Sequence, residues 1–597
     1  MEYSEYQSVI QAFYEKVEEL GDNPFLWRKV DKVYQPMSWN EVAERVKALS
    51  LGLRELGVKP GDRVTLVSDN QPEWLIADIA IVTAGAITVP AYTTNRVRDH
   101  KHVLNHSGSV GAIVSTKALS RNLFPAALDA PKCEWAISME DTKFAQSGPL
   151  EVHLWDEVME KGRQSGKDAL DLVPKAKRDD VCCFIYTSGT GGTPKAVMLS
   201  HGNLLCNCMG AYDLLKSFGL GEEVFLSFLP LSHSYEHTAG QYFPITIGAQ
   251  IYYAEGVESL LTNLAEVRPT IMTAVPRLYE AMHQRIRRGV EKQGGFKEKL
   301  FNLAVEIGTK RYKDPGSLTL KEKLLDILCE RLVRAKVRQR FGGRLKAFVS
   351  GGAALNPDIG VFFTALGLRL LQGYGQTEAS PVISANPPGK VKIHTVGLPL
   401  KGVEVKIAGD GEILVRGELV MKGYWNDEEA TAAAIQDGWL HTGDIGQFDE
   451  DGYLEITDRK KDIIVLSGGD NLSPARVEGF LTLQPEIAQA MVYGDKRPAL
   501  VALLVPDPDW LAEWAQSNGK PNDLSALADD PALAKALSGV IDQVNNSLSM
   551  LEKIRRFTIA DAPFSTENGM MTPTLKIKRH GIKERYGSTL EALYNKK

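Results

Sequence analysis

Cysteine is scarce in this chain, with six residues among 597. They are Cys133, Cys182, Cys183, Cys206, Cys208 and Cys329. Neither Cys182-Cys183 nor Cys206-x-Cys208 has a second pair at the spacing that a zinc site needs. We therefore expect buried, reduced thiols and a reducing cytoplasm, which argues against a disulfide framework or a cysteine-bound metal.

Long apolar runs and a strong charge imbalance are also missing. The longest apolar stretch, residues 74–89, is interrupted by Asp78 and Gly85 and ended by Pro90. It predicts a core helix followed by a strand, not a membrane span. The first five residues are acidic and lack the apolar core of a signal peptide. A net charge of −6 gives no reason to expect a nucleic-acid partner.

The chain is too long for a single hydrophobic core, so two or more domains are expected. From residue 40 to about 280, helical patterns alternate with short β-rich runs, which predicts parallel sheets flanked by helices. Residues 396–460 change to short strands and tight turns, typical of a small β-rich subdomain. A charged pentapeptide, residues 458–462, then leads into a final compact α/β region and is our candidate hinge.

A basic helical block stands out against this background. Residues 285–346 hold 18 Lys and Arg against 7 Asp and Glu, a net of 18 − 7 = +11, so the rest of the chain carries −6 − 11 = −17. Such a block could meet an anionic membrane surface or the phosphates of a ligand. The alternative is a solvated helical hairpin.

One stretch is more informative than any other. Residues 186–196 read Tyr-Thr-Ser-Gly-Thr-Gly-Gly-Thr-Pro-Lys-Ala, after an apolar run (181–185) that predicts a buried strand. Ser200 begins a predicted helix. We expect a flexible loop between strand and helix whose backbone N–H groups, with Lys195, can wrap polyphosphate oxygens. Because Pro194 precedes Lys195, the usual Gly-x-x-x-x-Gly-Lys-Ser/Thr pattern is not met, and a surface loop is the alternative.

A second segment, residues 373–378, reads Gly-Tyr-Gly-Gln-Thr-Glu and follows an apolar strand over residues 368–371. Tyr374 offers a flat face for a purine, and the flanking glycines allow close approach. Thr377 can donate to a phosphate, and Glu378 supplies a hard oxygen ligand suited to Mg²⁺. Alone this could be a strand-end turn, but the two segments together favour a nucleotide site.

In their order and spacing these segments resemble the signatures of the adenylate-forming superfamily, whose common loop is Tyr-Thr-Ser-Gly-Thr-Thr-Gly-x-Pro-Lys-Gly. Here Gly191 replaces a threonine and Ala196 a glycine. The likeness spans residues 180–580. Three features resemble AMP-dependent long-chain fatty acyl-CoA synthetases: Val-Pro-Arg-Leu-Tyr-Glu at 275–280, the basic helices, and Asp-Arg-Lys-Lys-Asp-Ile at 458–463.

This resemblance implies an α/β fold in two unequal parts. The large N-terminal domain, residues 1–459, would hold two flanking α/β sheets, the basic helical insert (about 285–346) and the β-rich subdomain (about 396–459). A smaller, mobile α+β lid domain would follow over residues 460–597, with its hinge near 458–462.

The resemblance also implies roles for single residues. Asp444 matches a ribose-binding aspartate, and a carboxylate suits a vicinal diol because it accepts two hydrogen bonds. Arg459 matches an arginine that reaches the ribose or a phosphate, and Lys461 matches the hinge residue. The implied nucleotide-binding set is Thr187, Ser188, Gly189, Thr190, Gly191, Gly192, Thr193, Lys195, Gly351, Gly352, Ala353, Gly373, Tyr374, Gly375, Thr377, Asp444, Arg459 and Lys461.

The implied catalytic residues are Lys576, His233 and Glu378, with Thr190 and Glu378 as Mg²⁺ ligands. Lys578 is a rival to Lys576. Residues 233–237 also spell His-x-x-Glu-His, an inverted zinc-protease motif, which we discount because they follow a strand and turn and not a helix. The resemblance instead places His233 near the substrate carboxylate, and we expect an acyl tunnel with contributions from Tyr235, Gln241 and Thr273.

The implied reaction activates a long-chain fatty acid with ATP and Mg²⁺, releases pyrophosphate, and transfers the acyl group to coenzyme A. A ligase for aryl or shorter acids, or a non-CoA adenylating enzyme of the same superfamily, is the alternative, because these share every nucleotide motif. We expect a cytoplasmic protein without nucleic-acid partners. Peripheral contact with the inner face of a membrane, through residues 285–346, and a homodimer are further expectations.

Overall fold

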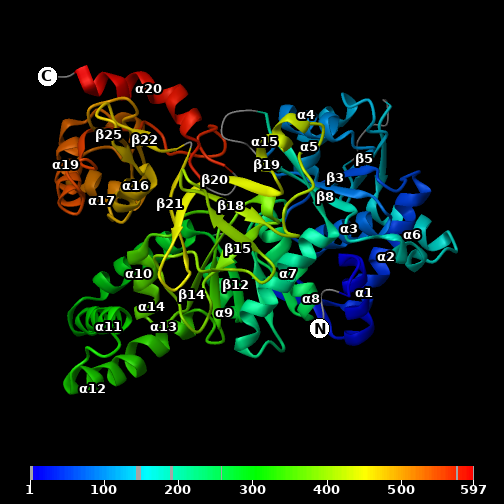
Figure 1. Cartoon of the computed structure of the whole chain (residues 1–597), viewed down its shortest axis with the longest axis horizontal. Coiled ribbons are helices and arrows are strands. Elements are labelled where there is room, and N and C mark those ends of the chain that lie inside the picture. Colours follow the sequence, from blue (N-terminus) through cyan, green and yellow to red (C-terminus); the bar gives the residue numbers. More distant parts are fainter. Residues whose placement is uncertain are drawn as a thin grey trace.

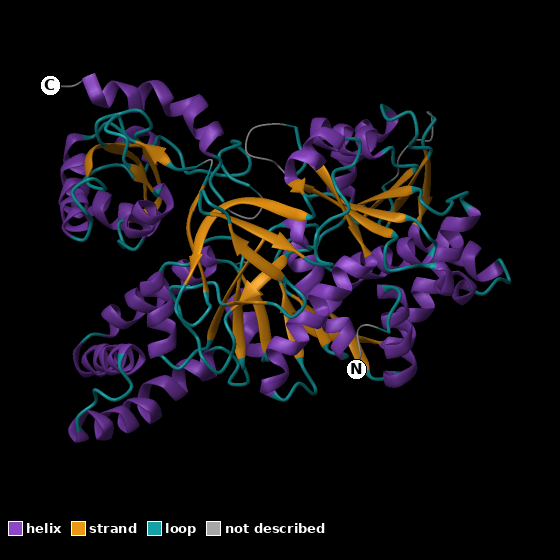
Figure 2. Cartoon of the chain, viewed as in Figure 1, coloured by secondary structure: helices purple, strands orange, loops and turns teal. Residues whose placement is uncertain are grey.

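The computed structural model describes residues 5–142, 149–187, 193–256, 258–460, 462–572 and 576–595. Two large sheets form the body of the molecule, with smaller sheets beside them and helices around them (Figures 1 and 2). The first large sheet has seven strands in the order β7-β6-β5-β3-β4-β8-β9. Their bounds are β7 Glu151–Leu154, β6 Trp135–Ser138, β5 Gly111–Val114, β3 Arg63–Val67, β4 Ile87–Pro90, β8 Val181–Thr187 and β9 Lys195–Ser200.

The second large sheet has nine strands in the order β16-β15-β14-β13-β12-β10-β11-β1-β2. Its central strands are parallel, and both edges are antiparallel. The bounds are β16 Leu398–Pro399, β15 Val382–Ala385, β14 Leu370–Gly375, β13 Ala347–Ser350, β12 Ile271–Ala274, β10 Val224–Ser227, β11 Gln250–Tyr253, β1 Pro24–Val30 and β2 Val33–Ser38.

Helix α3 (Pro72–Thr83) shows why the two sheets share one core. Its sequence is apolar on all sides, and every one of its residues is buried. It contacts β3 and β4 of the seven-stranded sheet and β1 of the nine-stranded sheet. The largest apolar cluster therefore combines side chains from both sheets with those of α3, including Leu66, Ile76 and Ile251.

The remaining helices of this part surround the two sheets (Figure 2). They are α1 Val9–Leu20, α2 Trp39–Glu55, α4 Val97–Ser107, α5 Lys117–Leu128, α6 Trp155–Gln164, α7 His201–Leu215, α8 Phe243–Ile247, α9 Leu260–Val267 and α14 Pro357–Ala365. The basic block is helical as predicted, with α10 Pro276–Gln293, α11 Gly295–Lys313, α12 Leu320–Cys329, the π-helical turn η4 Glu330–Arg334 and α13 Ala335–Arg340. All six cysteines are buried, as predicted, and none forms a disulfide.

A small antiparallel sheet follows, as the turn-rich sequence predicted. It contains β17 Glu404–Ile407, β18 Glu412–Arg416, β19 Ile435–Gln436, β20 Trp439–Phe448 and β21 Leu454–Arg459, with helix α15 Glu428–Ala434 before β19. Its apolar face packs in one cluster with Tyr374 of β14 and Ile383 of β15. This contact brings the ends of β20 and β21 next to the end of β14.

The last part of the chain forms its own core. Strands β24 Ile487–Tyr493, β25 Leu500–Pro506 and β26 Ile554–Ile559 make a three-stranded sheet, preceded by the short pair β22 Ile464–Val465 and β23 Asn471–Leu472. The helices are α16 Pro474–Thr482, α17 Pro508–Ser517, α18 Leu524–Leu527, α19 Pro531–Asn546 and α20 Arg579–Asn595. In Figure 1 these orange and red elements lie on the same side of the molecule as the green helices α10 to α13.

Arg288 of α10 joins the basic block to this last part. Its guanidinium donates to Asp507 Oδ1 at 2.5 Å, to Asp509 Oδ2 at 2.8 Å and to the Pro485 carbonyl at 3.2 Å. A further contact is the Asn356 amide, which donates to the Gly479 carbonyl at 3.1 Å. These contacts fix the position of the C-terminal elements over the large sheets.

Candidate active site

The glycine-rich loop lies between two antiparallel strands. Thr187 ends β8 and pairs with Lys195, the first residue of β9. The prediction of a loop leading directly into a helix is therefore wrong, because β9 intervenes and α7 begins only after Ser200, whose side chain caps it. The apolar run Ala-Val-Met-Leu at 196–199 was the overlooked signal for a strand. Ser188, Gly189, Thr190, Gly191 and Gly192 lie outside the described residues.

Lys195 stands at the base of this loop and is held on two sides. Its Nζ lies 3.0 Å from Asp427 Oδ2 and 5.1 Å from the centre of the Tyr424 ring. The Tyr424 hydroxyl in turn donates to Glu378 Oε1 at 2.8 Å. Lys195 and Glu378, about 180 residues apart in sequence, thus contact the same tyrosine, although neither Tyr424 nor Asp427 belongs to a recognisable motif.

The position of Glu378 is compatible with its predicted role as a cation ligand. It lies in the short helical turn η5 (Thr377–Ala379) that follows β14, and it is partly exposed. One carboxylate oxygen is held by Tyr424, so the other is the atom that would meet a hard divalent ion. Its neighbour Thr377 shares a hydrogen bond of 2.9 Å with the Ser234 hydroxyl, which links η5 to the segment containing His233.

Asp444 is a buried carboxylate with partners on both oxygens. Tyr374 of β14 donates its hydroxyl to Oδ2 at 2.6 Å, and Arg459 Nε donates to Oδ1 at 3.1 Å. Asp444 and Arg459 are directly paired across β20 and β21. Burial, and then the charge of Asp444, hold the pKa of the Tyr374 hydroxyl well above its ordinary value, so this hydroxyl stays a donor.

The glycines beside Tyr374 have a packing reason that the sequence did not reveal. A Cβ on Gly375 would lie 1.8 Å from the Pro381 carbonyl oxygen, and one on Gly373 would lie 3.2 Å from the Ser384 carbonyl oxygen. Both positions are needed for the close approach of β15 to β14. Closeness to a bound purine remains a prediction.

Replacing Gly375 with alanine should therefore disturb the site by displacing the backbone of β14 and β15. The added methyl must push β15 away from β14, and overpacking of this kind costs about 1–3 kcal/mol. We expect a lower melting temperature and at least about tenfold weaker AMP binding in calorimetry, because Tyr374 loses its position. Gly409→Ala is the control, since its Cβ would meet nothing within 4 Å. Unchanged AMP affinity in the Gly375 variant would contradict this account.

Gly351 lies under an aromatic ring. It follows β13, and a Cβ there would lie 3.0 Å from the Tyr235 ring. The Tyr235 hydroxyl donates to the Val349 carbonyl at 2.8 Å, which fixes the ring over the end of β13. Gly352 has a φ of +86°, a left-handed conformation that favours glycine, and Ala353 continues this turn. Gly351 is thus closely packed against Tyr235, whereas Ala353 is exposed.

The His-x-x-Glu-His residues do not converge on a common point. His233 lies before the π-helical segment η3 (Glu236–Tyr242), and its Nδ1 accepts from the Tyr235 amide at 3.2 Å. His237 points into the core, with Nε2 3.1 Å from Asp78 Oδ2. The Glu236 carboxylate instead accepts from Ser227 at 2.6 Å and from Thr273 at 2.7 Å. This geometry supports the rejection of a zinc site.

The residues expected along an acyl tunnel surround Glu236. Thr273 bonds it directly, Gln241 bonds the Ser227 hydroxyl at 3.2 Å, and Tyr235 precedes it. All are buried, and burial raises the pKa of Glu236 to about 7. An apolar cluster of Leu229, Tyr235 and Val275 adjoins them. The tunnel itself remains a prediction.

Lys576 reaches this region from the C-terminal part of the chain. Its backbone N–H donates to the Thr572 hydroxyl at 3.0 Å, and Met571 and Ile577 form an antiparallel bridge around it. Burial, and then the charge of Arg459, lower the pKa of Lys576 to about 8, while Asp444 opposes the shift. Burial and the charge of Lys576 lower the pKa of His233 to about 3, so His233 is neutral at pH 7. Lys576 is therefore electrostatically coupled to Arg459, Asp444 and His233, and its assignment as the catalytic lysine in place of Lys578 stays a prediction.

The adenylate formation that the resemblance implies should become slower as the pH rises through about 8. Below that value Lys576 is a cation, and above it the positive charge is lost, because its pKa is lowered. We expect kcat/KM for ATP, measured by pyrophosphate release from about pH 6 to pH 10, to decrease above about pH 8, which gives the pH profile a falling alkaline limb. In Lys576→Arg the limb should disappear, because a guanidinium stays charged. A limb that persists unchanged in that variant would assign it to another group.

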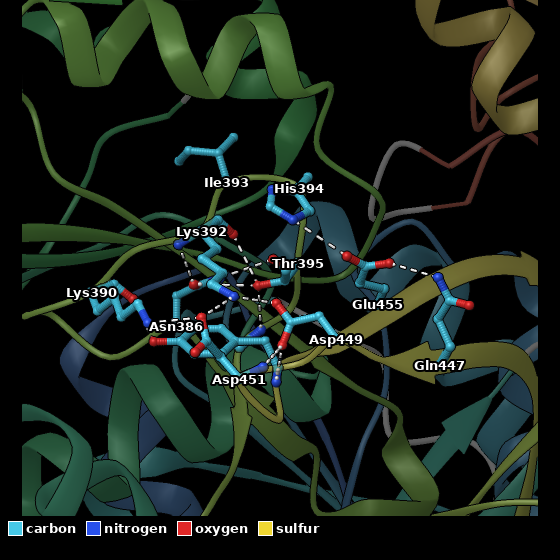
Figure 3. A network of polar contacts seen from close by, with 12 residues as sticks. Asn386, Lys390, Lys392, Ile393, His394, Thr395, Gln447, Asp449, Asp451 and Glu455 are labelled. Carbon is cyan, nitrogen blue, oxygen red and sulfur yellow. Dashed lines mark hydrogen bonds and ion pairs between the residues drawn. The ribbon is translucent and has the colours of Figure 1, made fainter. Parts of the chain in front are cut away.

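A cluster of possible metal ligands lies at the turn between β20 and β21 (Figure 3). His394, Asp449 and Glu455 lie close together, the one such group found among the described residues. Of these, Asp449 already has a cationic partner in Lys392, which also pairs with the neighbouring Asp451 at 2.7 Å, while Glu455 lies 3.3 Å from His394 Nε2. Lys390 also pairs with Asp451 at 2.8 Å. The cluster therefore fastens the segment before β16 to the small sheet.

Comparison with known proteins gives one family for nearly the whole chain. Residues 13–425 match the model described as AMP-binding enzyme, and residues 461–597 match the model described as AMP-binding enzyme C-terminal domain. Long-chain-fatty-acid–CoA ligase FadD15 of Mycobacterium bovis is 35% identical over 600 residues, 99% of this chain and 98% of that protein. Long chain acyl-CoA synthetase 6, peroxisomal, of Arabidopsis thaliana is 34% identical over 94% of this chain and 82% of that protein.

A solved structure with the same fold is the adenylation domain of a carboxylate reductase from Mycobacterium chelonae. It superposes with a TM-score of 0.80 at 22% identity, over 99% of this chain and 91% of that one. The fold expected from the sequence, a large α/β part followed by a smaller C-terminal part, is thereby confirmed. Lys461 lies outside the described residues, and its role as a hinge is untested.

Proposed function

The chain belongs to the AMP-binding enzyme family, and from that membership we propose that it is an AMP-forming ligase joining a long-chain fatty acid to coenzyme A. The fatty acid carboxylate attacks the α-phosphorus of ATP, the bond to pyrophosphate breaks, and acyl-adenylate forms. The coenzyme A thiol then attacks the acyl carbon and releases AMP. Full-length identity of 31–35% to proteins named as long-chain ligases or synthetases supports this reaction.

The observation that carries the proposal at the atomic level is the position of Lys576. It lies on the C-terminal part of the chain, yet its charge lowers the pKa of His233. In turn, Arg459 of the large part lowers the pKa of Lys576, and Asp444 raises it. A cation at this point can meet the negative charge that develops when a carboxylate attacks a triphosphate. The substrate carboxylate is the nucleophile, so the protein needs no covalent nucleophile of its own.

The other residues then have distinct tasks. Asp444 accepts the ribose hydroxyls, held in place by Tyr374 and Arg459. Lys195 and the loop that it borders hold phosphate oxygens, and Thr377 adds a hydroxyl. His233 is neutral, so it can donate a hydrogen bond to the fatty acid carboxylate without carrying charge. We assign Glu378 and Thr190 to Mg²⁺, which when bound neutralises phosphate charge.

In the second step the coenzyme A thiol, in place of ATP, must reach the carboxyl carbon of the acyl group. Lys576, on the C-terminal part, is coupled to His233, Arg459 and Asp444 in this structure, so we propose that the lid, residues 460–597, rotates away from the large domain, residues 1–459, to admit the thiol. Lys460 donates to Asp410 at 2.7 Å and thus belongs with the small sheet. The rotation is therefore assigned to Lys461.

A panel of acids tests the substrate class. Pyrophosphate release with ATP, Mg²⁺ and coenzyme A should be fastest among acids from octanoate to oleate, and much slower with coumarate or acetate. Burying each additional CH₂ is worth about 0.8 kcal/mol, so two carbons change affinity roughly fifteenfold and the preference should be steep. Faster turnover of coumarate or acetate would make the chain an aryl or short-chain ligase instead.

Two partner proposals also remain. A homodimer is one, and peripheral contact with a membrane through residues 285–346 is the other. Within the described ranges, no helix combines the length and apolarity needed to cross a bilayer. The exposed basic side chains of the helical block support the second proposal.

A further inference from the structure

Helix α12 and the turn η4 that continues it carry an unusual concentration of exposed apolar side chains. Leu320 is 81% exposed, Leu324 71% and Ile327 68%, and Leu328 and Leu332 are 44% and 38% exposed. These are five of the fifteen large apolar side chains that are exposed in the described part of the chain. Scattered apolar residues on a surface are ordinary, but a group of five within thirteen residues indicates a binding surface.

The five side chains form one face of the helix. Their spacing of four, seven, eight and twelve residues from Leu320 is that of a helical stripe. The opposite face packs against the molecule, since Cys329 is buried and Glu322 and Asp326 pair with Lys310 and Arg311 of α11. The helix thus directs its polar face inward and its apolar face to solvent, the reverse of a surface helix in a soluble domain.

The side-chain charges around this stripe that have no partner within the protein are positive. Each acid of the segment has an internal partner: Glu322 pairs with Lys310, Asp326 with Arg311 and Arg334, and Glu330 with Arg338. Five basic side chains are exposed, and none of them forms an ion pair with another described residue. They are Lys321, Lys323, Arg331, Lys336 and Arg340. Their charge stays available to a partner.

We propose that the α12–η4 face docks on an anionic lipid bilayer. An apolar stripe with basic residues beside it is the pattern of a helix that lies in a membrane interface, with the leucines among the acyl chains and the lysines at the headgroups. Helix α12 lies at an outer corner of the molecule (Figure 1), and its apolar side chains are exposed. The inference rests on the proposed function, because a long-chain fatty acid is itself concentrated in bilayers.

A second copy of this chain fits the face less well. A symmetric contact would place the same basic side chains opposite one another, and like charges at an interface are repulsive. A stable protein interface also uses about 20–30 residues a side, whereas this stripe has five. A bilayer needs no shape complementarity and supplies the opposite charge.

The test is co-sedimentation of the full-length protein with vesicles. Vesicles of phosphatidylcholine with about one third phosphatidylglycerol should bind it, and high salt or phosphatidylcholine alone should weaken binding severalfold. Leu324→Gln/Ile327→Gln should reduce partition at least about tenfold, because two apolar side chains no longer enter the acyl region. Lys321→Gln/Lys323→Gln should reduce it severalfold on anionic vesicles only.

Matched controls come from other exposed positions. Val33→Gln/Met550→Gln removes two apolar side chains that are 58% and 69% exposed, and Lys401→Gln/Lys535→Gln removes two exposed charges. Both should bind vesicles like the wild type. If the wild type does not bind, or if the Leu324/Ile327 variant binds as well as the wild type, the proposal is wrong. Conversion of a wild-type dimer to a monomer by that variant, without vesicle binding by either, would assign the face to a copy of the chain.

A parallel assay separates this proposal from the function on which it rests. All variants should turn over oleate presented in detergent micelles at the wild-type rate, because none of the substituted residues is near Lys576 or Glu378. When oleate is delivered in anionic vesicles, the Leu324→Gln/Ile327→Gln variant should turn it over more slowly than the wild type. The Val33→Gln/Met550→Gln control should turn it over at the wild-type rate. Micellar turnover without vesicle binding would overturn the docking surface only, whereas vesicle binding without any turnover would overturn the ligase function only.

Discussion

Lys576→Ala should slow adenylate formation by about 10²–10³ in rate while leaving thioester formation from supplied acyl-adenylate largely intact. Loss of one preorganised charge partner of a transition state costs about 2.7–4 kcal/mol, and in our proposal Lys576 is the cation that the lid adds to Asp444 and Arg459 of the small sheet. The thiol step starts from an adenylate that is already made, so it does not need this cation. The two half-reactions are measured by pyrophosphate exchange and by thioester release.

Lys578→Ala is the matched control, since Lys578 lies two residues away, and its backbone N–H donates to the Met570 carbonyl at 2.7 Å. That hydrogen bond survives the substitution, and adenylation should change little. Equal losses in both half-reactions of the Lys576 variant would indicate a folding defect of the lid. Unchanged pyrophosphate exchange would show that Lys576 is not the catalytic lysine.

Glu378→Gln should be the second severe variant, with adenylation reduced by at least about 10². The amide keeps the shape and can still accept from the Tyr424 hydroxyl, so Tyr424 and Lys195 should stay in place. What is lost is the negative oxygen that a hard divalent cation requires. The apparent affinity for Mg²⁺, titrated at fixed ATP in the pyrophosphate assay, should weaken together with the rate.

Two comparisons make this result specific. Glu428→Gln removes an exposed carboxylate from the nearby helix α15 and should leave Mg²⁺ dependence unchanged. Tyr424→Phe removes the hydroxyl that holds Glu378, so it should have an intermediate effect. If Glu378→Gln retained the wild-type Mg²⁺ titration, the metal assignment would have to be abandoned.

Much of the architecture was predictable because it depends on local patterns. The strand expected at 250–253 is β11, and the apolar stretch at 74–89, which Asp78 and Gly85 interrupt, corresponds to the buried helix α3 and then β4. The helical nature of the basic block followed from its periodicity in the same way. The candidate site was located by two short motifs, and the structure brings Glu378 within reach of Lys195 through Tyr424.

What failed depended on contacts between distant segments. Strand β9 was missed because a lysine, a proline and a capping serine around 194–200 suggested a turn into a helix, while its pairing with β8 decides the structure. Glycines 373 and 375 also have a packing role against β15 that the motif did not reveal, while their role in ligand approach stays a prediction. Tyr424 and Asp427 carry no motif, and only the packing of the small sheet region brings them to the loop.

Arg288 has a consequence for the order of events in turnover. It belongs to the same helical block as α12, and it grips Asp507 and Asp509 of the lid. The rotation that we propose for the lid would break these ion pairs, and dissolved ions compete for them. A higher salt concentration should thus favour the proposed thiol-accepting arrangement over the adenylate-forming one. The relative population of the two lid arrangements would then depend on ionic strength.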